Sequence, residues 1–326
     1  MLTYCELPQL SAIGFSGEDA QSFLHNQLTC DVAALGPGLS TYGSYCTPKG
    51  RILATFLLWY LGDRYFMQLP SSLREAIQKR LSMYVLRSKV KVEDAGAQWK
   101  AAGLSGRDAA SHVERVLGAV PQRDHEVVST PDSTVIRLPA DRYEILIPHS
   151  SAPEILEKLK EGAQTLEPAH WDWLDIRAGV PTITKPTQEQ FVPQMVNLDL
   201  IGGLTFTKGC YPGQEIVARM HFLGKLKQRM YLAHLSTHLP THLPTHLSNE
   251  VAAAASPQPG DKLYSAALGT QSSGMVVNAA RSPEGGHDLL AVIQMASAEG
   301  QAVHWKSPDG PALELLALPY EVTANP

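Results

Sequence analysis

The sequence lacks any apolar run long enough to cross a membrane, and it has only 4 cysteines in 326 residues. The run from Ile52 to Leu61 has the length of a buried strand, whereas a membrane helix needs about 20 apolar residues. The N-terminus has no basic region followed by an apolar stretch, so we expect no signal peptide and a cytoplasmic protein. Cys5, Cys30, Cys46 and Cys210 stand far apart with no C-x-x-C pair, which argues against a disulfide framework, a zinc site and a stably held iron–sulfur cluster.

Charged residues are also few, at 18% of the chain, and the formal net charge is −5. General affinity for nucleic acid is therefore not indicated, and we do not expect direct binding of nucleic acid. A hydrophobic content of 44% is ordinary for a folded protein of two or three domains. One segment departs from this balance, because it holds five basic residues and only Glu215 as counter-charge: Lys208, Arg219, Lys225, Lys227 and Arg229. Such a run is usually a solvated face.

The order of predicted elements indicates an α+β protein. Two mixed α/β units, residues 1–95 and 96–229, each combine strands with amphipathic helices and should pack together. From residue 230 onward, short strands alternate with turn residues, which predicts an antiparallel C-terminal β-barrel over 230–326. A low-complexity insertion interrupts this unit at about 236–260.

Local signals mark several helix ends. Ser16 is a predicted N-cap for the helix that carries Leu24. Pro168 should begin a second helix, which Gly179 and Pro181 end.

The insertion contains histidines at intervals of four residues, a spacing that would align metal ligands on a helix. Two prolines within the run prevent that helix, because proline lacks the N–H donor and clashes with the preceding turn. We therefore expect a loop without a metal site. The histidines are His234, His238, His242 and His246, and the prolines are Pro240 and Pro244.

The segment KGCYPGQEIVAR, from Lys208 to Arg219, places one cysteine in a constrained stretch. Pro212 suits a first helical position, so we expect Cys210 at or just before a helix N-terminus. There the helix dipole and the Lys208 ammonium would stabilise a thiolate. The residues alone leave open whether Cys210 is reactive or is a small buried residue in a tight turn.

A second candidate site is WDWLDIRAG. Trp171 and Trp173 offer flat faces that could stack on a heteroaromatic ring, and Arg177 could hold a carboxylate. The alternative is that both tryptophans belong to the core.

These segments together resemble the YgfZ-type folate-binding proteins, relatives of the aminomethyltransferase (T protein) of the glycine cleavage system. The resemblance covers nearly the whole chain. It includes FSGEDAQSFLHNQLTCDV, YCTPKGRI and LDIRAGVP, and it is most specific in FVPQMVNLDLIGGLTFTKGCYPGQEIVAR.

The resemblance implies a folate-binding pair of α+β units closed by a barrel. It also implies a tetrahydrofolate-binding accessory role in iron–sulfur cluster assembly or repair and in iron–sulfur-dependent tRNA modification, with client enzymes as partners. Cys210 and Lys208 would be the functional pair, and Trp171 would stack on the pterin. The other predicted folate contacts are Arg177, Gly209, Tyr211, Glu215 and Arg219, and the basic stretch would meet a polyglutamate tail.

Two positions differ from the family pattern. Bacterial members can present a folate-contacting tryptophan where this chain has Leu10. The aminomethyltransferase branch carries acidic residues where this chain has Ala54 and Thr55, so ordinary aminomethyl transfer is not expected. The rival hypotheses are a folate-dependent one-carbon transferase that uses Cys210, and direct recognition of tRNA.

Overall fold

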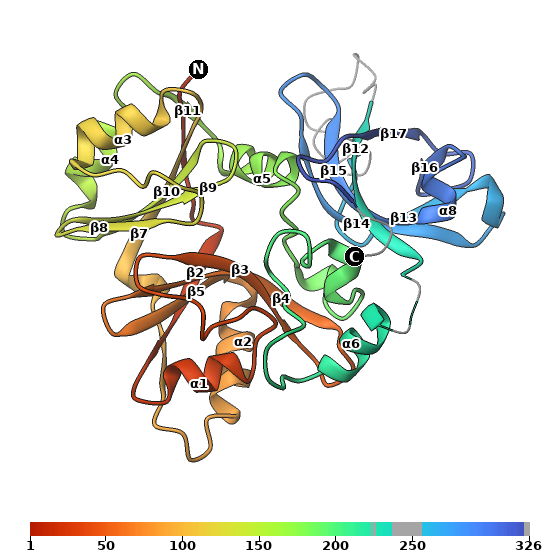
Figure 1. The fold of residues 1–326 in the computed structure, drawn as a ribbon. Helices are drawn as coiled ribbons and strands as arrows, with labels where there is room; N and C mark the ends of the chain where they lie inside the picture. Colours follow the sequence, from red (N-terminus) through yellow and green to blue (C-terminus); the bar gives the residue numbers. More distant parts are fainter. Residues whose placement is uncertain (223, 225, 237–255, 323–326) are drawn as a thin grey trace.

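The computed structural model describes residues 1–222, 224, 226–236 and 256–322. It consists of two β-sheet units and a closed barrel arranged around a common centre (Figure 1). The predicted α+β class with a C-terminal antiparallel barrel is confirmed. Among the described residues, no helix has both the length and the apolar content needed to span a bilayer.

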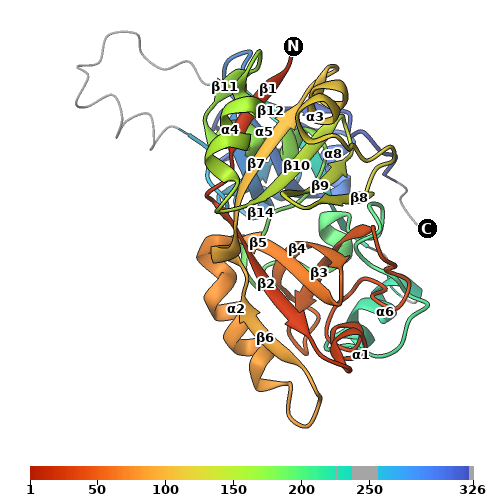
Figure 2. The same cartoon turned by 90° about the vertical axis from the view of Figure 1, so that its left-hand side faces the viewer.

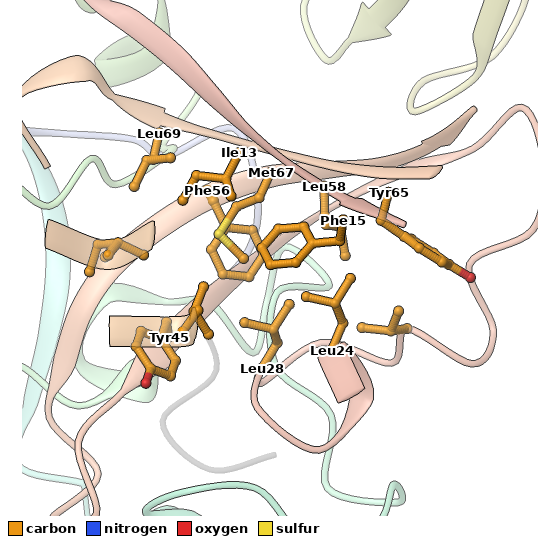
Figure 3. Packing of buried hydrophobic residues seen from close by; sticks show 14 of the residues in the cluster. Ile13, Phe15, Leu24, Leu28, Tyr45, Phe56, Leu58, Tyr65, Met67 and Leu69 are labelled. Carbon is orange, nitrogen blue, oxygen red and sulfur yellow. The ribbon is translucent and has the colours of Figure 1, made fainter. Parts of the chain in front are cut away.

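The first sheet has five strands in the order β3-β4-β5-β2-β6. Helices α1 and α2 pack on it, and Figure 2 shows α2 beside β6 at the outer edge. Buried apolar side chains fill the space between the sheet and the helices, where Leu24 and Leu28 face Phe15 and Met67 (Figure 3). The elements are β2 (Leu10–Ser16), α1 (Ala20–His25), β3 (Ser40–Cys46), β4 (Ile52–Leu61), β5 (Arg64–Pro70), α2 (Ser71–Met83) and β6 (Lys91–Asp94).

The second sheet has six strands in the order β11-β1-β7-β10-β9-β8. Its first strand in the chain, β1, comes from the N-terminus and pairs antiparallel with β7, so the chain enters this sheet before it builds the other one. The elements are β1 (Thr3–Glu6), β7 (Trp99–Ser105), α3 (Ala109–Leu117), β8 (Val127–Thr130), β9 (Ser133–Leu138), β10 (Arg142–Pro148), α4 (Ala152–Lys160) and β11 (Gln164–Leu166).

The barrel closes in the order β12-β15-β14-β13-β16-β17. Helix α5 (Pro168–Arg177) lies between the six-stranded sheet and the barrel (Figure 1). The elements are β12 (Gln228–Leu235), β13 (Lys262–Ser265), β14 (Ser272–Arg281), β15 (His287–Gln294), α8 (Met295–Ala298), β16 (Val303–Trp305) and β17 (Ala312–Leu316). In the described ranges, the remaining helices are α6 (Gln214–Phe222) and the short 3-10 turns Gly96–Gln98, Lys185–Thr187, Pro193–Val196 and Ala266–Leu268.

Two predicted helix starts are wrong. Ser16 ends strand β2, and α1 begins after Asp19 instead, because Gly17 adopts a left-handed conformation between them. Helix α6 begins at Gln214 and not at Pro212, since Gly213 has φ +84° and cannot belong to a right-handed helix. The predicted start of α5 at Pro168 is confirmed.

Candidate functional site

A small chamber lies at the centre of the molecule, where the two sheets and the start of the loop after α5 meet. Its cavity volume is about 60 Å³, enough for a few water molecules. Apolar residues such as Leu10 and Val180 form part of its wall. The polar and aromatic side chains that line it are Tyr42, Thr55, Phe56, Gln68, Glu144, Trp171, Asp175 and Thr182.

Trp171 forms one wall of this chamber and is only 2% exposed. Its ring packs against the backbone of Gly103, where any Cβ would overlap the six-membered ring. The guanidinium carbon of Arg142 lies 5.6 Å from the centre of the Trp171 ring. Because α5 and β7 hold the ring between them, Trp171 is a rigid apolar surface.

Two carboxyl groups face the chamber. Gln68 of the five-stranded sheet donates its amide N–H to Glu144 of the six-stranded sheet, which joins the sheets across the chamber. Burial raises the pKa of Glu144 to about 7, although the hydrogen bond from Gln68 opposes this. Burial also raises the pKa of Asp175, against the opposing effect of the ion pair that it forms with Arg142.

Two buried polar side chains at and beside the chamber interact with each other. The Tyr42 hydroxyl and Arg142 Nη2 make no close hydrogen bond within the described residues, although Tyr42 is 7% and Arg142 0% exposed. Each of the two side chains affects the pKa of the other, so they are neighbours and not isolated groups. Tyr42 also lines the chamber, where a polar ligand or water would give its hydroxyl a further partner.

The chamber adjoins two larger cavities. A cavity of about 350 Å³, the barrel-side cavity, lies between α5, the start of α2 and β14, and shares Asp175 and Val180 with the chamber. A cavity of about 330 Å³, the inter-sheet cavity, lies between the two sheets and shares Leu10 and Gln68 with the chamber. Both volumes fall in the range of about 300–1,000 Å³ that is typical of ligand pockets.

The cysteine motif lies elsewhere, against the five-stranded sheet unit. Lys208 is 9% exposed and its ammonium donates to three backbone carbonyls, those of His25, Leu28 (2.5 Å) and Cys30 (3.0 Å). Burial lowers the pKa of Lys208 to about 8. The lysine thus joins the last carbonyl of α1, that of His25, to two carbonyls of the segment that follows the helix.

Two glycines explain how the motif meets the segment YCTPKGRI. Gly213 and Gly50 both have positive φ, and a Cβ on Gly213 would lie 2.5 Å from the Cα of Gly50. This close approach fixes the turn that precedes α6. Cys210 lies four residues before the first residue of that helix and is exposed, while the other three cysteines are buried.

Comparison with known proteins identifies the family. The family described as the GCVT N-terminal domain matches residues 2–167. The chain is 33% identical over 228 residues to the tRNA-modifying protein YgfZ of Colwellia psychrerythraea, covering 69% of each chain. It is 33% identical to the protein of the same name from Yersinia enterocolitica, over 71% of this chain and 70% of that protein.

The chain belongs to the YgfZ/GcvT family. A further YgfZ protein, from Blochmanniella pennsylvanica, is 29% identical over 71% of each chain. The aminomethyltransferase T of the glycine cleavage system from Bartonella henselae has the same fold, with a TM-score of 0.74, 18% identity, and coverage of 98% of this chain and 86% of that one.

In this member of the YgfZ/GcvT family, the predicted site residues fall into three separate places, of which the third is that of Arg177 beside the barrel. Trp171 lines the chamber, whereas Lys208, Cys210 and the neighbouring predicted contacts line neither the chamber nor its two adjoining cavities. Of those neighbours, Tyr211 is buried below the Lys208 ammonium, and three others are exposed: Gly209, Glu215 and Arg219.

Two basic residues have partners that the sequence did not indicate. Arg177 faces the barrel, with its Nη1 3.6 Å from a carboxylate oxygen of Asp288. Arg229 is 1% exposed and forms a bidentate ion pair with Asp199, at 2.7 and 2.9 Å. The prediction that Arg229 belongs to a free basic stretch is therefore wrong, because a buried and paired guanidinium cannot reach a ligand tail. Lys225 lies outside the described residues.

The histidine run is only partly described. His234 lies on β12 and its Nδ1 is 2.7 Å from Asp288, while His238, His242 and His246 lie outside the described residues. No group of three or more His, Cys, Asp or Glu side chains that could hold a metal ion occurs in the part of the chain that the structure describes.

Sequence reasoning missed most of the chamber. Arg142 and Glu144 stand two residues apart on β10 (RYEILIP), a strand that is otherwise mostly apolar. Gln68 is likewise a polar residue among the apolar residues of β5 (RYFMQLP). A charged or amide residue on the buried face of such a strand is a usable signal, because it needs a partner there. The partner itself lies on the other sheet and cannot be read from the sequence.

Proposed function

We propose that this protein binds a reduced folate, with the pteridine ring in the central chamber. The observation that carries the proposal is the combination of a rigid tryptophan wall with two buried polar side chains in the same chamber, the carboxyl group of Glu144 and the hydroxyl of Tyr42. A pteridine offers a flat face to the tryptophan and polar edges to such atoms.

The acids of the chamber suit the pteridine edge. The 2-amino group and N3–H of a pterin are adjacent donors, and a carboxylate accepts two such hydrogen bonds side by side. On binding, Glu144 would lose the hydrogen bond from the Gln68 amide and accept hydrogen bonds from these two pterin donors instead. The Tyr42 hydroxyl would donate to an acceptor atom of the ring. Since the chamber holds about 60 Å³, the rest of the ligand must extend into an adjoining cavity.

We propose that the folate serves a role in tRNA modification, which is the role that the names of the relatives carry. In the finer form of this proposal the protein is an accessory factor for iron–sulfur enzymes, including those that modify tRNA. Cys210 would act at the surface, toward a client enzyme, since its side chain is exposed.

A one-carbon transferase that uses Cys210 is the alternative. It requires the thiol beside the folate, and Cys210 lines neither the chamber nor its adjoining cavities. At the two positions where the aminomethyltransferase branch carries acidic residues, this chain has Ala54 and Thr55. Ala54 is buried in the core, and Thr55 accepts the Ile183 N–H at 3.0 Å. These observations favour the accessory role.

Calorimetric titration with tetrahydrofolate tests the proposal. Glu144→Gln keeps the size of the side chain but loses the charged acceptor, so affinity should fall by about 1.5–3 kcal/mol, the contribution of a hydrogen bond to a charged group. The matched control is Glu93→Gln, which changes an ion-paired glutamate on β6 of the other sheet. Equal affinities for the wild type and Glu144→Gln would refute the chamber as the pteridine site.

A further inference from the structure

Helix α6 presents a row of large side chains that the fold leaves exposed. Ile216 is 43% and Phe222 67% exposed, although most large apolar residues of the described chain are buried. Arg219 is exposed as well and lies between them, because residues three apart are neighbours on a helix surface. We call these three residues the α6 face. Exposed apolar residues that gather on one surface mark interaction sites.

Two further rings hold Phe222 in place. Phe206 and His221 stack face to face, with ring centroids 3.7 Å apart and an interplanar angle of 13°. The Phe222 ring lies edge-on to both, with centroid distances of 6.1 Å to Phe206 and 4.7 Å to His221. A side chain that is fixed before binding loses little rotamer entropy on association, so Phe222 has the properties of an interface anchor.

The loop that carries Cys210 runs alongside α6. Both of its ends are fixed on the helix, because Phe206 stacks on His221 near the C-terminal end and the last residue of the loop directly precedes Gln214. Gln214 Nε2 also donates to the carbonyl oxygen of Lys208 at 3.3 Å. Cys210 is exposed, so a molecule that covers the α6 face would lie next to its thiol.

Exposed cations surround the α6 face. A Cβ on Gly50 would lie 3.3 Å from the Cβ of Ile216, so the turn that carries the exposed Lys49 adjoins the helix. On the helix, this turn and the segment that leads to β12, the exposed charges among the described residues are three cations and one acid: Lys49, Arg219, Lys227 and Glu215. Such a surface complements a partner with exposed carboxylates.

We infer that the α6 face docks a protein partner whose own surface combines apolar side chains with carboxylates, beside the Cys210 thiol. The inference rests on the proposed function, and it assigns the surface that receives the iron–sulfur client enzyme. Single-stranded RNA fits less well, because stacking of bases needs free ring faces. Phe206 and His221 stack on each other, Ile216 has no ring, and the Glu215 carboxylate repels phosphates.

Binding of a purified client tests this surface. The probe is an iron–sulfur enzyme that methylthiolates tRNA, immobilised for biolayer interferometry, with the full-length protein in solution. Phe222→Ser and Arg219→Glu change the α6 face. Leu86→Ser and Arg87→Glu are the matched controls, because Leu86 is 86% exposed and Arg87 is exposed in the turn between α2 and β6.

Phe222→Ser and Arg219→Glu should each weaken binding at least tenfold, and neither control should change it. Wild-type affinity should also fall as salt screens the charges. Ile216→Ser should repeat the result if Phe222→Ser does not fold. Four outcomes would overturn the inference: equal binding by Phe222→Ser and Leu86→Ser, no binding by the wild type, loss of binding after ribonuclease treatment, or a wild-type dimer in analytical ultracentrifugation that Phe222→Ser separates.

A strain that lacks the native copy separates this inference from the proposed function. If the wild type and Phe222→Ser restore tRNA methylthiolation equally, the docking surface is wrong and the proposed function stands. If the wild type does not restore it, or does not bind tetrahydrofolate, the proposed function itself is refuted.

Discussion

Lys208 should prove to be a structural residue whose loss destabilises the fold. The change to test is Lys208→Met, which keeps most of the apolar stem and removes the ammonium. In the folded protein that ammonium donates to the carbonyls of His25, Leu28 and Cys30. Hydrogen bonds from a charged donor contribute about 1.5–3 kcal/mol each, and water reaching the vacated carbonyls recovers part of that. We expect a net loss of about 3–5 kcal/mol, which is the range for breaking a buried charged interaction.

Urea unfolding followed by far-ultraviolet circular dichroism measures this loss. Lys49→Met is the control, because Lys49 is an exposed lysine in the turn that contacts the same motif, and its loss should change stability by no more than about 0.5 kcal/mol. If Lys208→Met unfolds at the same urea concentration as Lys49→Met, the three hydrogen bonds do not stabilise the protein and the structural assignment of Lys208 is refuted.

Three further predictions concern other residues. Gly213→Ala should destabilise the protein by clearly more than Gly202→Ala, because both glycines have positive φ but only Gly213 contacts a neighbouring backbone; thermal melting of the two variants decides this. Since burial raises the pKa of Glu144 from 4.5 to about 7, the folded state binds more protons than the unfolded state between pH 4.5 and pH 7. Wild-type stability should therefore fall by about 3 kcal/mol more than that of Glu144→Gln as the pH rises from 4.5 through 7; parallel slopes in urea titrations would contradict it. Iodoacetamide at neutral pH should alkylate Cys210 first, because the other three cysteines are buried with raised pKa values; mass spectrometry that finds another cysteine modified first would show otherwise.

The fold was largely predictable from local signals. Alternating strands and amphipathic helices carry their period in the sequence, and the turn residues of the barrel mark its strands. What the sequence could not show is pairing over long distances. Strand β1 joins β7 about a hundred residues later, and Arg229 finds Asp199 from another element.

The candidate site was predictable only in part, for the same reason. Trp171 was predicted as a stacking residue from its flat ring in WDWLDIRAG and from the family resemblance, and it lines the chamber. Glu144 and Gln68 were not predicted because they contact each other only where the two sheets face one another. The three acceptors of the Lys208 ammonium were not predictable either, since they lie about 180 residues earlier in the chain.

A crystal structure of the protein with bound tetrahydrofolate would show directly where the pteridine ring lies. We expect the ring against Trp171, with Glu144 within hydrogen-bonding distance of its 2-amino group and with the Gln68–Glu144 hydrogen bond broken. A pteridine bound at the Cys210 motif instead, with the chamber unchanged, would refute the chamber as the pteridine site.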